Sequence, residues 1–305
     1  MSDTITPKAF IPGSSRATLL TLGANPAAQK GLEFGALHNP VVRPEQGDIR
    51  FVDYTTTESL RAHPHADTVD KSAIVNVDYI WSGSGSLAEV IKTGELFEYA
   101  IASHVIEHVP NIVCWFFGIA DVLTPGAVFN LAIPDKRYTF DVRRKLTTLG
   151  EVVESHLLQF THPSIRQMFD HCYDAVAIEP GAVWKNDVDI KNIPRFCGDN
   201  ALQLAYDQAL EILKTHRYYD SHCLIVTPLS FLRLIEGLSR LHLFPFILRD
   251  FHGTKVGDFE FFANFERPKE MSASELREQQ LSILASYKEK LVSAAHLAAL
   301  GADPG

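Results

Sequence analysis

The stretch F-E-Y-A-I-A-S-H-V-I-E-H-V-P, from Phe97 to Pro110, decides which fold the sequence predicts. Its first seven residues are an apolar run typical of a buried strand. The next five, His104 to His108, form H-x-x-E-H, a metallopeptidase zinc pattern that requires both histidines on one face of a continuing helix. Pro110 follows too closely for such a helix, because proline disrupts a helix interior. We therefore expect a strand that leads into a crossover loop, and a metal-dependent hydrolase is kept only as an alternative.

The chain on both sides of this stretch alternates short apolar runs with helical or loop segments, which is the pattern of parallel β/α units. Helical apolar spacing occurs at 111–123, directly after the motif, and again at 230–238. The segments predicted as strands are 31–36, 48–54, 73–80, 97–103 and 127–134, with two closing strands at 243–250 and 259–267. The predicted fold is α/β: a Rossmann-like, seven-stranded, mostly parallel sheet with flanking helices.

Composition narrows the class of protein. The chain has 305 residues, of which 46% are apolar and 21% charged, as in ordinary globular proteins. Its net charge of −9 argues against indiscriminate binding to nucleic acid, which needs a basic surface. No apolar run approaches the ~20 residues of a membrane span, and the N-terminus has no signal-peptide pattern. The four cysteines stand far apart, which indicates free thiols. We expect a cytoplasmic protein without membrane or nucleic-acid partners.

Acidic residues stand at or near the ends of the first three predicted strands. Asp53 ends the second strand 20 residues after Glu33, the spacing of a carboxylate that binds ribose hydroxyls. Gly35 allows the backbone to approach a ligand closely. Asp78, near the end of the third strand, is placed to accept a hydrogen bond from an adenine amino group. Because an open α/β sheet binds ligands at the carboxyl ends of its strands, these residues indicate a nucleoside-containing cofactor.

The run Y-A-I-A-S-H-V-I-E-H-V-P-N, followed by D-V-L-T-P-G-A-V-F-N-L-A-I-P, resembles the fourth and fifth strand region of class I S-adenosylmethionine-dependent methyltransferases. It is most similar to their small-molecule, type 11-like branch, with S-x-x-x-E-H-V-x-D and L-x-P-G-G. The resemblance covers residues 31–134 well and 227–267 more loosely. It implies S-adenosylmethionine as the cofactor. The cofactor-binding residues that it implies are Glu33, Gly35, Asp53, Asp78, Ser103 and His104, the last two beside the sulfonium.

The chain departs from the family pattern at one position of the first loop. The usual G-x-G is Gly35-Ala36-Leu37 here, so the second glycine is missing. A non-catalytic protein that binds S-adenosylmethionine or S-adenosylhomocysteine is therefore an alternative to the enzyme. An NAD-dependent dehydrogenase shares the layout of strands and acids, but it should carry a complete G-x-G-x-x-G, which the sequence lacks.

The predicted organisation has five parts. Residues 1–30 are an N-terminal lead-in, and residues 31–134 form the S-adenosylmethionine-binding half of the sheet. Residues 135–226, where aromatic, histidine and charged residues mix, are an inserted helical region that binds the acceptor. Residues 227–268 complete the sheet. Residues 269–305 form a C-terminal amphipathic helix, which either packs on its own domain or makes a homo-oligomer contact.

Methyl transfer needs an acceptor held in line with the methyl group and, for a hydroxyl, a base of near-neutral pKa. His108 and His104 lie at the appropriate strand end and are the predicted catalytic residues. No metal is assigned. Metal remains an alternative, because some small-RNA and quinone O-methyltransferases carry E-x-x-E-H here and bind a divalent ion. His104 replaces the first glutamate of that pattern, and the sequence does not identify a further ligand.

The insertion contains weaker candidates for contact with the acceptor. A surface loop explains those at 135–141 equally well, and ordinary packing explains the histidines and aromatic residues more readily. The candidates are Asp135, Lys136, Arg137, Tyr138, Asp141, His162, His171, Trp184, Arg217, Tyr218, Tyr219 and His222. The function predicted from the sequence is methylation of an oxygen, less readily a nitrogen, of a small molecule or saccharide.

Overall fold

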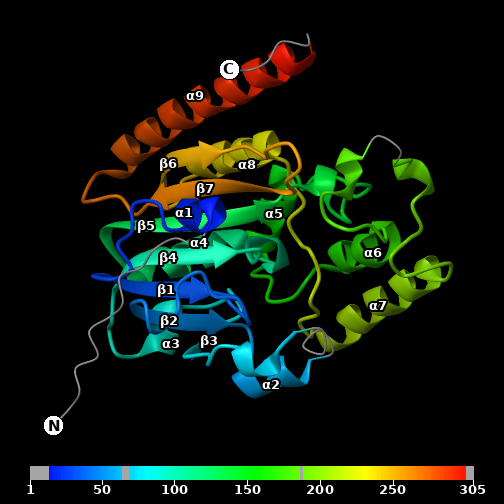
Figure 1. The fold of residues 1–305 in the computed structure, drawn as a ribbon, viewed down its shortest axis with the longest axis horizontal. Coiled ribbons are helices and arrows are strands. Elements are labelled where there is room, and N and C mark those ends of the chain that lie inside the picture. The colour runs from blue at the N-terminus through cyan, green and yellow to red at the C-terminus, as the bar shows by residue number, and fades with distance from the viewer. Residues whose placement is uncertain (1–13, 64–68, 186–187, 300–305) are drawn as a thin grey trace.

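A computed structural model describes residues 14–63, 69–185 and 188–299, with side chains described as far as residue 293. It contains one seven-stranded sheet in the order β3-β2-β1-β4-β5-β7-β6 (Figure 1). The first five strands pair in parallel, and β7 runs antiparallel to both β5 and β6. The strands are β1 (Lys30–Phe34), β2 (Asp48–Asp53), β3 (Tyr79–Ile80), β4 (Phe97–Ser103), β5 (Leu123–Pro134), β6 (Ile247–His252) and β7 (Glu260–Glu266). The predicted Rossmann-like, mostly parallel sheet is confirmed.

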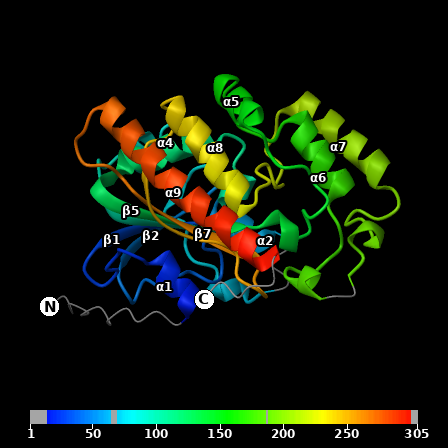
Figure 2. The ribbon, with the colours of Figure 1, turned by 90° about the horizontal axis from the view of Figure 1, so that it is seen from above.

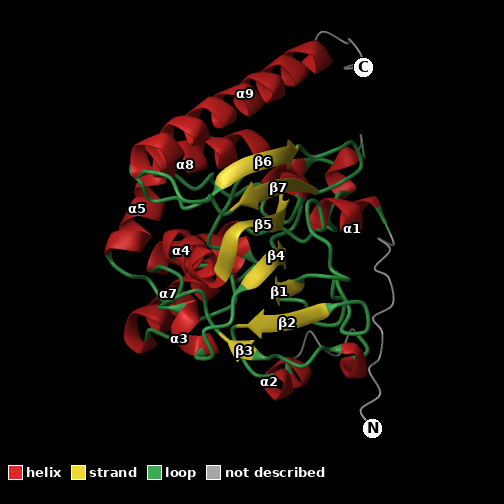
Figure 3. Ribbon diagram, turned by 90° about the vertical axis from the view of Figure 1, so that its left-hand side faces the viewer, coloured by secondary structure: helices red, strands yellow, loops and turns green. Residues whose placement is uncertain are grey.

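Helices cover both faces of this sheet. Figure 3 shows α3, α4 and α8 on one face and α1 on the other, and Figure 2 shows α9 running beside α8. The helices are α1 (Ser15–Leu20), α2 (Thr57–Ala62), α3 (Leu87–Ile91), α4 (Ile112–Val122), α5 (Leu149–Leu157), α6 (Ile165–Asp174), α7 (Ala201–Thr215), α8 (Pro228–Arg240) and α9 (Ala273–Ala299). No helix in the described ranges is long and apolar enough to cross a bilayer.

The larger hydrophobic core lies between the sheet and α4. This helix begins after Asn111, whose side chain accepts a hydrogen bond from Cys114 N at 3.1 Å. Its apolar residues then fall on the face turned toward the sheet, where Phe116 packs edge-on against Phe129 of β5 and Phe265 of β7. All three rings are buried, and each is worth about 1.5–3 kcal/mol of hydrophobic stabilisation. The core therefore fixes β4 and β5, which flank the H-x-x-E-H segment.

Three predicted strands differ from the observed ones by four or more residues at their first residue. The fifth was expected at 127–134, but β5 begins at Leu123. The third was expected at 73–80, but β3 contains only Tyr79 and Ile80, because residues 71–73 form a 3-10 turn. Asp78 therefore precedes β3 instead of ending it. The sixth was expected at 243–250 but begins at Ile247, because Gln280 of α9 donates hydrogen bonds to two carbonyls of the preceding segment.

The described part of residues 135–226 contains α5, α6 and α7, joined by loops and short 3-10 turns, and its role in binding an acceptor stays a prediction. α6 and α7 pack against each other around Met168, Cys172 and Ile212, and they lie beyond the carboxyl ends of the parallel strands (Figure 1). The C-terminal helix α9 packs on α8 and β6, and its homo-oligomer contact stays a prediction. Residues 1–13 of the lead-in and 300–305 of the tail lie outside the described residues.

Candidate functional site

An open cleft lies at the carboxyl ends of β1, β2 and β4, with about 410 Å³ of empty space. Open α/β sheets bind their ligands at this edge. Residues from the loops after four parallel strands and from the insertion line it. Its lining includes Gly35, Asp53, Tyr54, Trp81, Ser82, His108 and Tyr218.

Asp53 is the acidic residue of this cleft. It ends β2 and is 9% exposed, and its Oδ1 accepts a hydrogen bond from Tyr54 N at 2.8 Å. Burial, assisted by the charge of Asp220, raises the pKa of Asp53 to about 6. The carboxylate is thus ionised at neutral pH and has acceptor capacity left for a ligand hydroxyl.

The loop after β1 brings its backbone to the cleft at Gly35. This residue has φ +62°, and a Cβ there would lie 2.7 Å from Val105 Cγ2, so a side chain would be both strained and crowded. Leu37 occupies the position of the missing second glycine, and its φ of +47° is also left-handed.

Glu33 stabilises the loop after β1. Its carboxylate accepts hydrogen bonds from Val41 N at 2.7 Å and Val42 N at 3.1 Å. Burial raises the pKa of Glu33 to about 7, against the effect of these hydrogen bonds. Glu33 is not among the described residues that line the cleft. It therefore shapes the loop that forms the cleft, and direct cofactor contact by Glu33 stays a prediction.

The raised pKa of Glu33 predicts a pH-dependent stability. Its ordinary value is 4.5, so between about pH 4.5 and pH 7 the folded protein holds a proton that the unfolded chain has lost. Stability therefore falls as pH rises through this window, by about 3 kcal/mol, and is level above it. We expect Glu33→Gln to remove this slope in urea unfolding, whereas Glu45→Gln, at an exposed position, keeps it. Identical slopes in both variants would contradict the assignment.

Ser103 and His104 are not among the described residues that line the cleft, and their side chains contact residues of β7 and α1. His104 Nε2 lies 2.8 Å from Glu260 Oε2, its Nδ1 lies 3.4 Å from Glu107 Oε1, and Ser103 Oγ accepts a hydrogen bond from Arg16 at 2.5 Å. Burial lowers the pKa of His104, but the two carboxylates outweigh it and raise the pKa to about 9. A protonated imidazole is a poor general base, so we leave His104 out of the proposed reaction.

The H-x-x-E-H segment is a turn, as predicted. Residues 106–108 form a 3-10 helix, and His104 has φ +54°. The two histidine side chains diverge, because His104 pairs with Glu260 and His108 pairs with Asp220. The helical peptidase site is therefore not formed.

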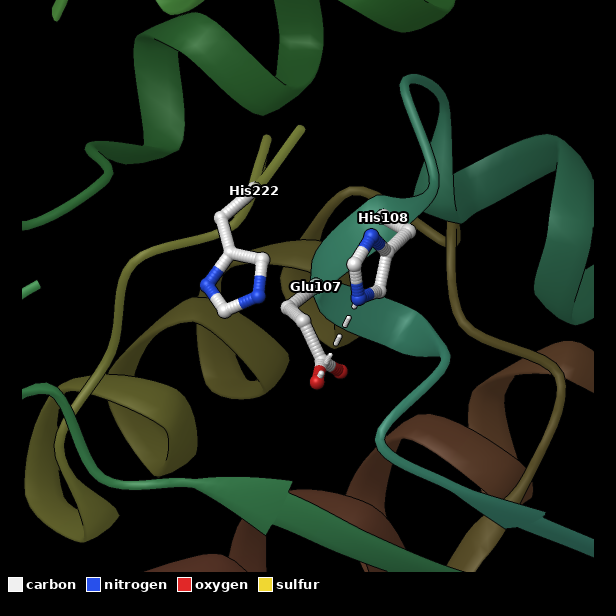
Figure 4. Close-up of side chains that lie close together, drawn as sticks. All are labelled: Glu107, His108 and His222. Atoms are coloured by element: carbon white, nitrogen blue, oxygen red, sulfur yellow. Dashed lines mark ion pairs between the residues drawn. The ribbon is translucent and has the colours of Figure 1, made fainter. Parts of the chain in front are cut away.

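Glu107, His108 and His222 form a second feature, here named the Glu–His cluster. Figure 4 shows the two imidazole rings on either side of the Glu107 carboxylate. The ring centroids are 4.7 Å apart, and one ligand atom of each residue lies within 4.8 Å of the others. The carbonyl of Glu107 accepts hydrogen bonds from Cys223 N at 2.5 Å and Leu224 N at 3.1 Å. These bonds attach the end of the insertion to the motif and bring His222 to the cluster.

Two buried charged residues, Asp141 and Arg144, hold His222 in place. Asp141 Oδ2 lies 2.5 Å from His222 Nδ1, and Arg144 donates to Asp141 Oδ1 at 2.8 Å and to the His222 carbonyl at 2.9 Å. Burial alone would raise the pKa of Asp141, but His222 and Arg144 together hold it well below its usual range. The sequence marked Asp141 and His222 only as weak candidates, and no spacing pattern connects them to Glu107.

The other weak candidates from the insertion fall into two groups. Tyr218 lines the cleft, and its hydroxyl donates to the His108 carbonyl at 3.3 Å. Tyr138 stacks on Trp184 with ring centroids 4.1 Å apart, outside the described cleft lining. The candidates that the structure does not bring into this lining are Asp135, Lys136, Arg137, His162, His171, Arg217 and Tyr219, and their contact with an acceptor stays a prediction.

No protein-family model matches the sequence, and no curated protein matches it. Among solved structures, the O-methyltransferase of a trans-AT polyketide synthase multienzyme of Brevibacillus brevis, in complex with S-adenosyl-L-homocysteine, is similar. It is 12% identical, with 96% of this chain and 94% of that chain covered and a TM-score of 0.38. The fold is Rossmann-like, as the resemblance to class I methyltransferases predicts.

Two further solved structures are similar at the same level. The CcbJ methyltransferase from Streptomyces caelestis is 12% identical, with 83% of this chain and 94% of that chain covered and a TM-score of 0.41. A Rhodobacter sphaeroides protein described as a Zn-dependent alcohol dehydrogenase is 11% identical, with 86% and 92% covered and a TM-score of 0.46. These similarities concern the fold alone, and the function is therefore inferred from the residues of the cleft.

Proposed function

We propose that the protein is an S-adenosylmethionine-dependent methyltransferase that methylates an oxygen of a small molecule or saccharide. The observation that carries this proposal is the largely buried Asp53 carboxylate at the end of β2, in a cleft at the strand ends. A carboxylate in this position is suited to the two hydroxyls of a ribose. A Rossmann-like dehydrogenase would use the same carboxylate, but its glycine pattern is absent from the loop at Gly35.

The cleft residues fit the parts of this cofactor. Asp53 would hold the ribose, and the backbone at Gly35 would lie against the methionine part. Tyr54 and Trp81 offer aromatic surface for the base, and Ser82 adds a hydroxyl. Asp78, the predicted adenine partner, is left out of the proposal because it is not among the described residues that line the cleft, and its contact with adenine stays a prediction.

The cofactor supplies a methyl group on a positively charged sulfur, and the protein has to hold an acceptor oxygen in line with it. Of the two predicted catalytic histidines, His108 lines the cleft. Its Nδ1 lies 2.7 Å from Asp220 Oδ1, which fixes the orientation of the ring. Burial lowers the pKa of His108, but Asp220 and Glu107 outweigh it and raise the pKa, so we infer that His108 positions the acceptor hydroxyl at the wall of the cleft, next to Tyr218, and does not serve as its general base.

Calorimetric titration with S-adenosylmethionine and S-adenosylhomocysteine tests this function. We expect the folded wild type to bind both ligands, and Asp53→Asn to bind each of them about 10–100-fold more weakly, because a hydrogen bond to a charged group contributes about 1.5–3 kcal/mol. Asp48→Asn is the matched control, because Asp48 begins the strand that Asp53 ends. It should bind like the wild type.

Three outcomes separate the alternatives. No binding of either ligand by folded wild type would reject the methyltransferase, and binding of NAD in their place would favour the dehydrogenase. Binding without turnover on any oxygen acceptor, with saccharides tested first, would favour the non-catalytic alternative.

A further inference from the structure

We propose that Glu107, His108 and His222 bind one divalent transition-metal ion, for which Zn²⁺ and Co²⁺ are the first candidates. The three side chains offer one ligand atom each, and these atoms lie within 4.8 Å of one another. A tetrahedral ion with bonds of about 2.1 Å needs ligand atoms about 3.4 Å apart. A small inward movement of the three side chains therefore completes the site. Two imidazoles and one carboxylate are a donor set that suits such ions.

One oxygen of the buried Glu107 carboxylate has no hydrogen-bond partner among the described residues, and a bound cation would be such a partner. Glu107 is 1% exposed, and its Oε2 has no hydrogen-bond partner among the described residues. Its Oε1 lies 3.4 Å from His104 Nδ1 and 3.9 Å from His108 Nε2. A buried carboxylate oxygen without a partner is costly, and such groups usually have a partner or a bound ion. The empty side of this carboxylate is thus the first indication of a ligand.

Both histidines are oriented in the way that metal ligands usually are. His108 Nδ1 pairs with Asp220 Oδ1 at 2.7 Å, and His222 Nδ1 pairs with Asp141 Oδ2 at 2.5 Å. In each ring this leaves Nε2 as the nitrogen that is free to bind. A histidine that binds a metal almost always donates its other N–H to a carboxylate or carbonyl, which fixes the tautomer and the direction of the ring. Asp141 and Asp220 are therefore positioning residues of the proposed site.

His104, the first residue of the motif, does not belong to this site. Both of its ring nitrogens already face carboxylates, Nε2 toward Glu260 and Nδ1 toward Glu107. The proposed site thus combines two residues of the motif with His222 of the insertion, a ligand that the spacing of the motif does not reveal.

The ion would lie at the wall of the cleft, because His108 belongs both to the Glu–His cluster and to the cleft lining. An acceptor hydroxyl bound to the ion loses its proton to water more readily. In the transfer, a bond forms between the acceptor oxygen and the methyl carbon, and the carbon–sulfur bond breaks with its electron pair passing to sulfur. This role rests on the proposed function, whereas binding of the ion does not.

Metal binding is measured on the full-length protein after treatment with EDTA and dialysis against Zn²⁺ or Co²⁺. We expect about one ion per chain by elemental analysis in the wild type and in His38→Ala, a control at an exposed histidine. Glu107→Gln and His222→Ala should bind at least about 100-fold more weakly, and Asp220→Asn about 10–100-fold more weakly. Circular dichroism shows whether each variant is folded, and Glu107→Gln changes the side-chain volume least.

The proposal is overturned if folded wild type retains no ion, or if Glu107→Gln and His222→Ala bind ions as tightly as wild type does. Titration of the same metal-free samples with S-adenosylhomocysteine keeps the two proposals apart. Binding of S-adenosylhomocysteine without any ion binding rejects the metal site alone. Ion binding without affinity for S-adenosylhomocysteine supports the metal site and rejects the proposed function.

Discussion

Replacing Arg144 with methionine is expected to lower the free energy of unfolding by about 3–5 kcal/mol, the usual effect of removing one partner from a buried ion pair. The Arg144 and Asp141 side chains are each 3% exposed. The guanidinium donates at 2.8 Å to Asp141 and at 2.9 Å to the carbonyl of His222. Without it, the buried Asp141 carboxylate keeps His222 as its side-chain hydrogen-bond partner among the described residues, and the buried His222 carbonyl loses its hydrogen bond from Arg144.

Urea and thermal unfolding measure this effect. A loss of this size corresponds to a fall in Tm of roughly 10 °C for a chain of several hundred residues. Arg166→Met is the matched control, because Arg166 also pairs with acidic side chains but is 53% exposed, and it should cost at most about 1 kcal/mol. Equal losses in the two variants would show that burial of the Arg144 pair contributes nothing. Because Arg144 holds Asp141 and His222, we also expect Arg144→Met to weaken metal binding.

Replacing Gly31 with alanine is expected to destabilise the protein by about 3 kcal/mol or more, at the upper end of the effects of overpacking a core. Gly31 of β1 pairs directly with Tyr99 of β4. A Cβ at Gly31 would lie 2.0 Å from Tyr99 Cζ and 2.3 Å from its hydroxyl oxygen. Tyr99 is fully buried, so its ring has no solvent-filled space into which it can move.

A double-mutant cycle identifies the cause of this loss. Tyr99→Leu removes the ring that the new methyl group meets, so Gly31→Ala should cost far less in a Tyr99→Leu background than in the wild type. We expect a coupling free energy of about 1–3 kcal/mol from chemical unfolding of the four proteins. Additivity within about 0.5 kcal/mol would mean that alanine destabilises β1 for a reason other than contact with Tyr99.

The sequence predicted those parts of the fold that depend on neighbouring residues. The apolar run that ends at Ser103, followed closely by Pro110, predicted a strand and a turn, and both are found. Asp53 was placed correctly at the end of β2, because the largely apolar stretch 49–52 leads directly into this acidic residue. The third strand was overestimated, because apolar residues in 73–78 suggest a strand whether or not a neighbouring strand pairs with them.

The site could be predicted only in part. Ser103 ends β4 and His104 follows it, as expected, but their side chains pair with Arg16 and Glu260 and do not enter the described cleft lining. The sequence contains both partners, yet nothing in their spacing connects α1 and β7 with the end of β4. The direction of a side chain at a strand end depends on such partners, and that is why the predicted role of His104 is not retained.

By itself, the sequence determined the class of fold, the order of its strands and turns, and a carboxylate at the cleft, because hydrophobic periodicity, proline and strand ends act over a few residues. Only the tertiary structure decided which polar side chains meet. Asp220 lies 112 residues from His108, and Asp141 lies 81 residues from His222. Their contacts form when the insertion packs against the strand ends and the Glu107 carbonyl accepts hydrogen bonds from the backbone N–H groups of Cys223 and Leu224. Such contacts depend on the packing of the whole chain, which local spacing does not encode.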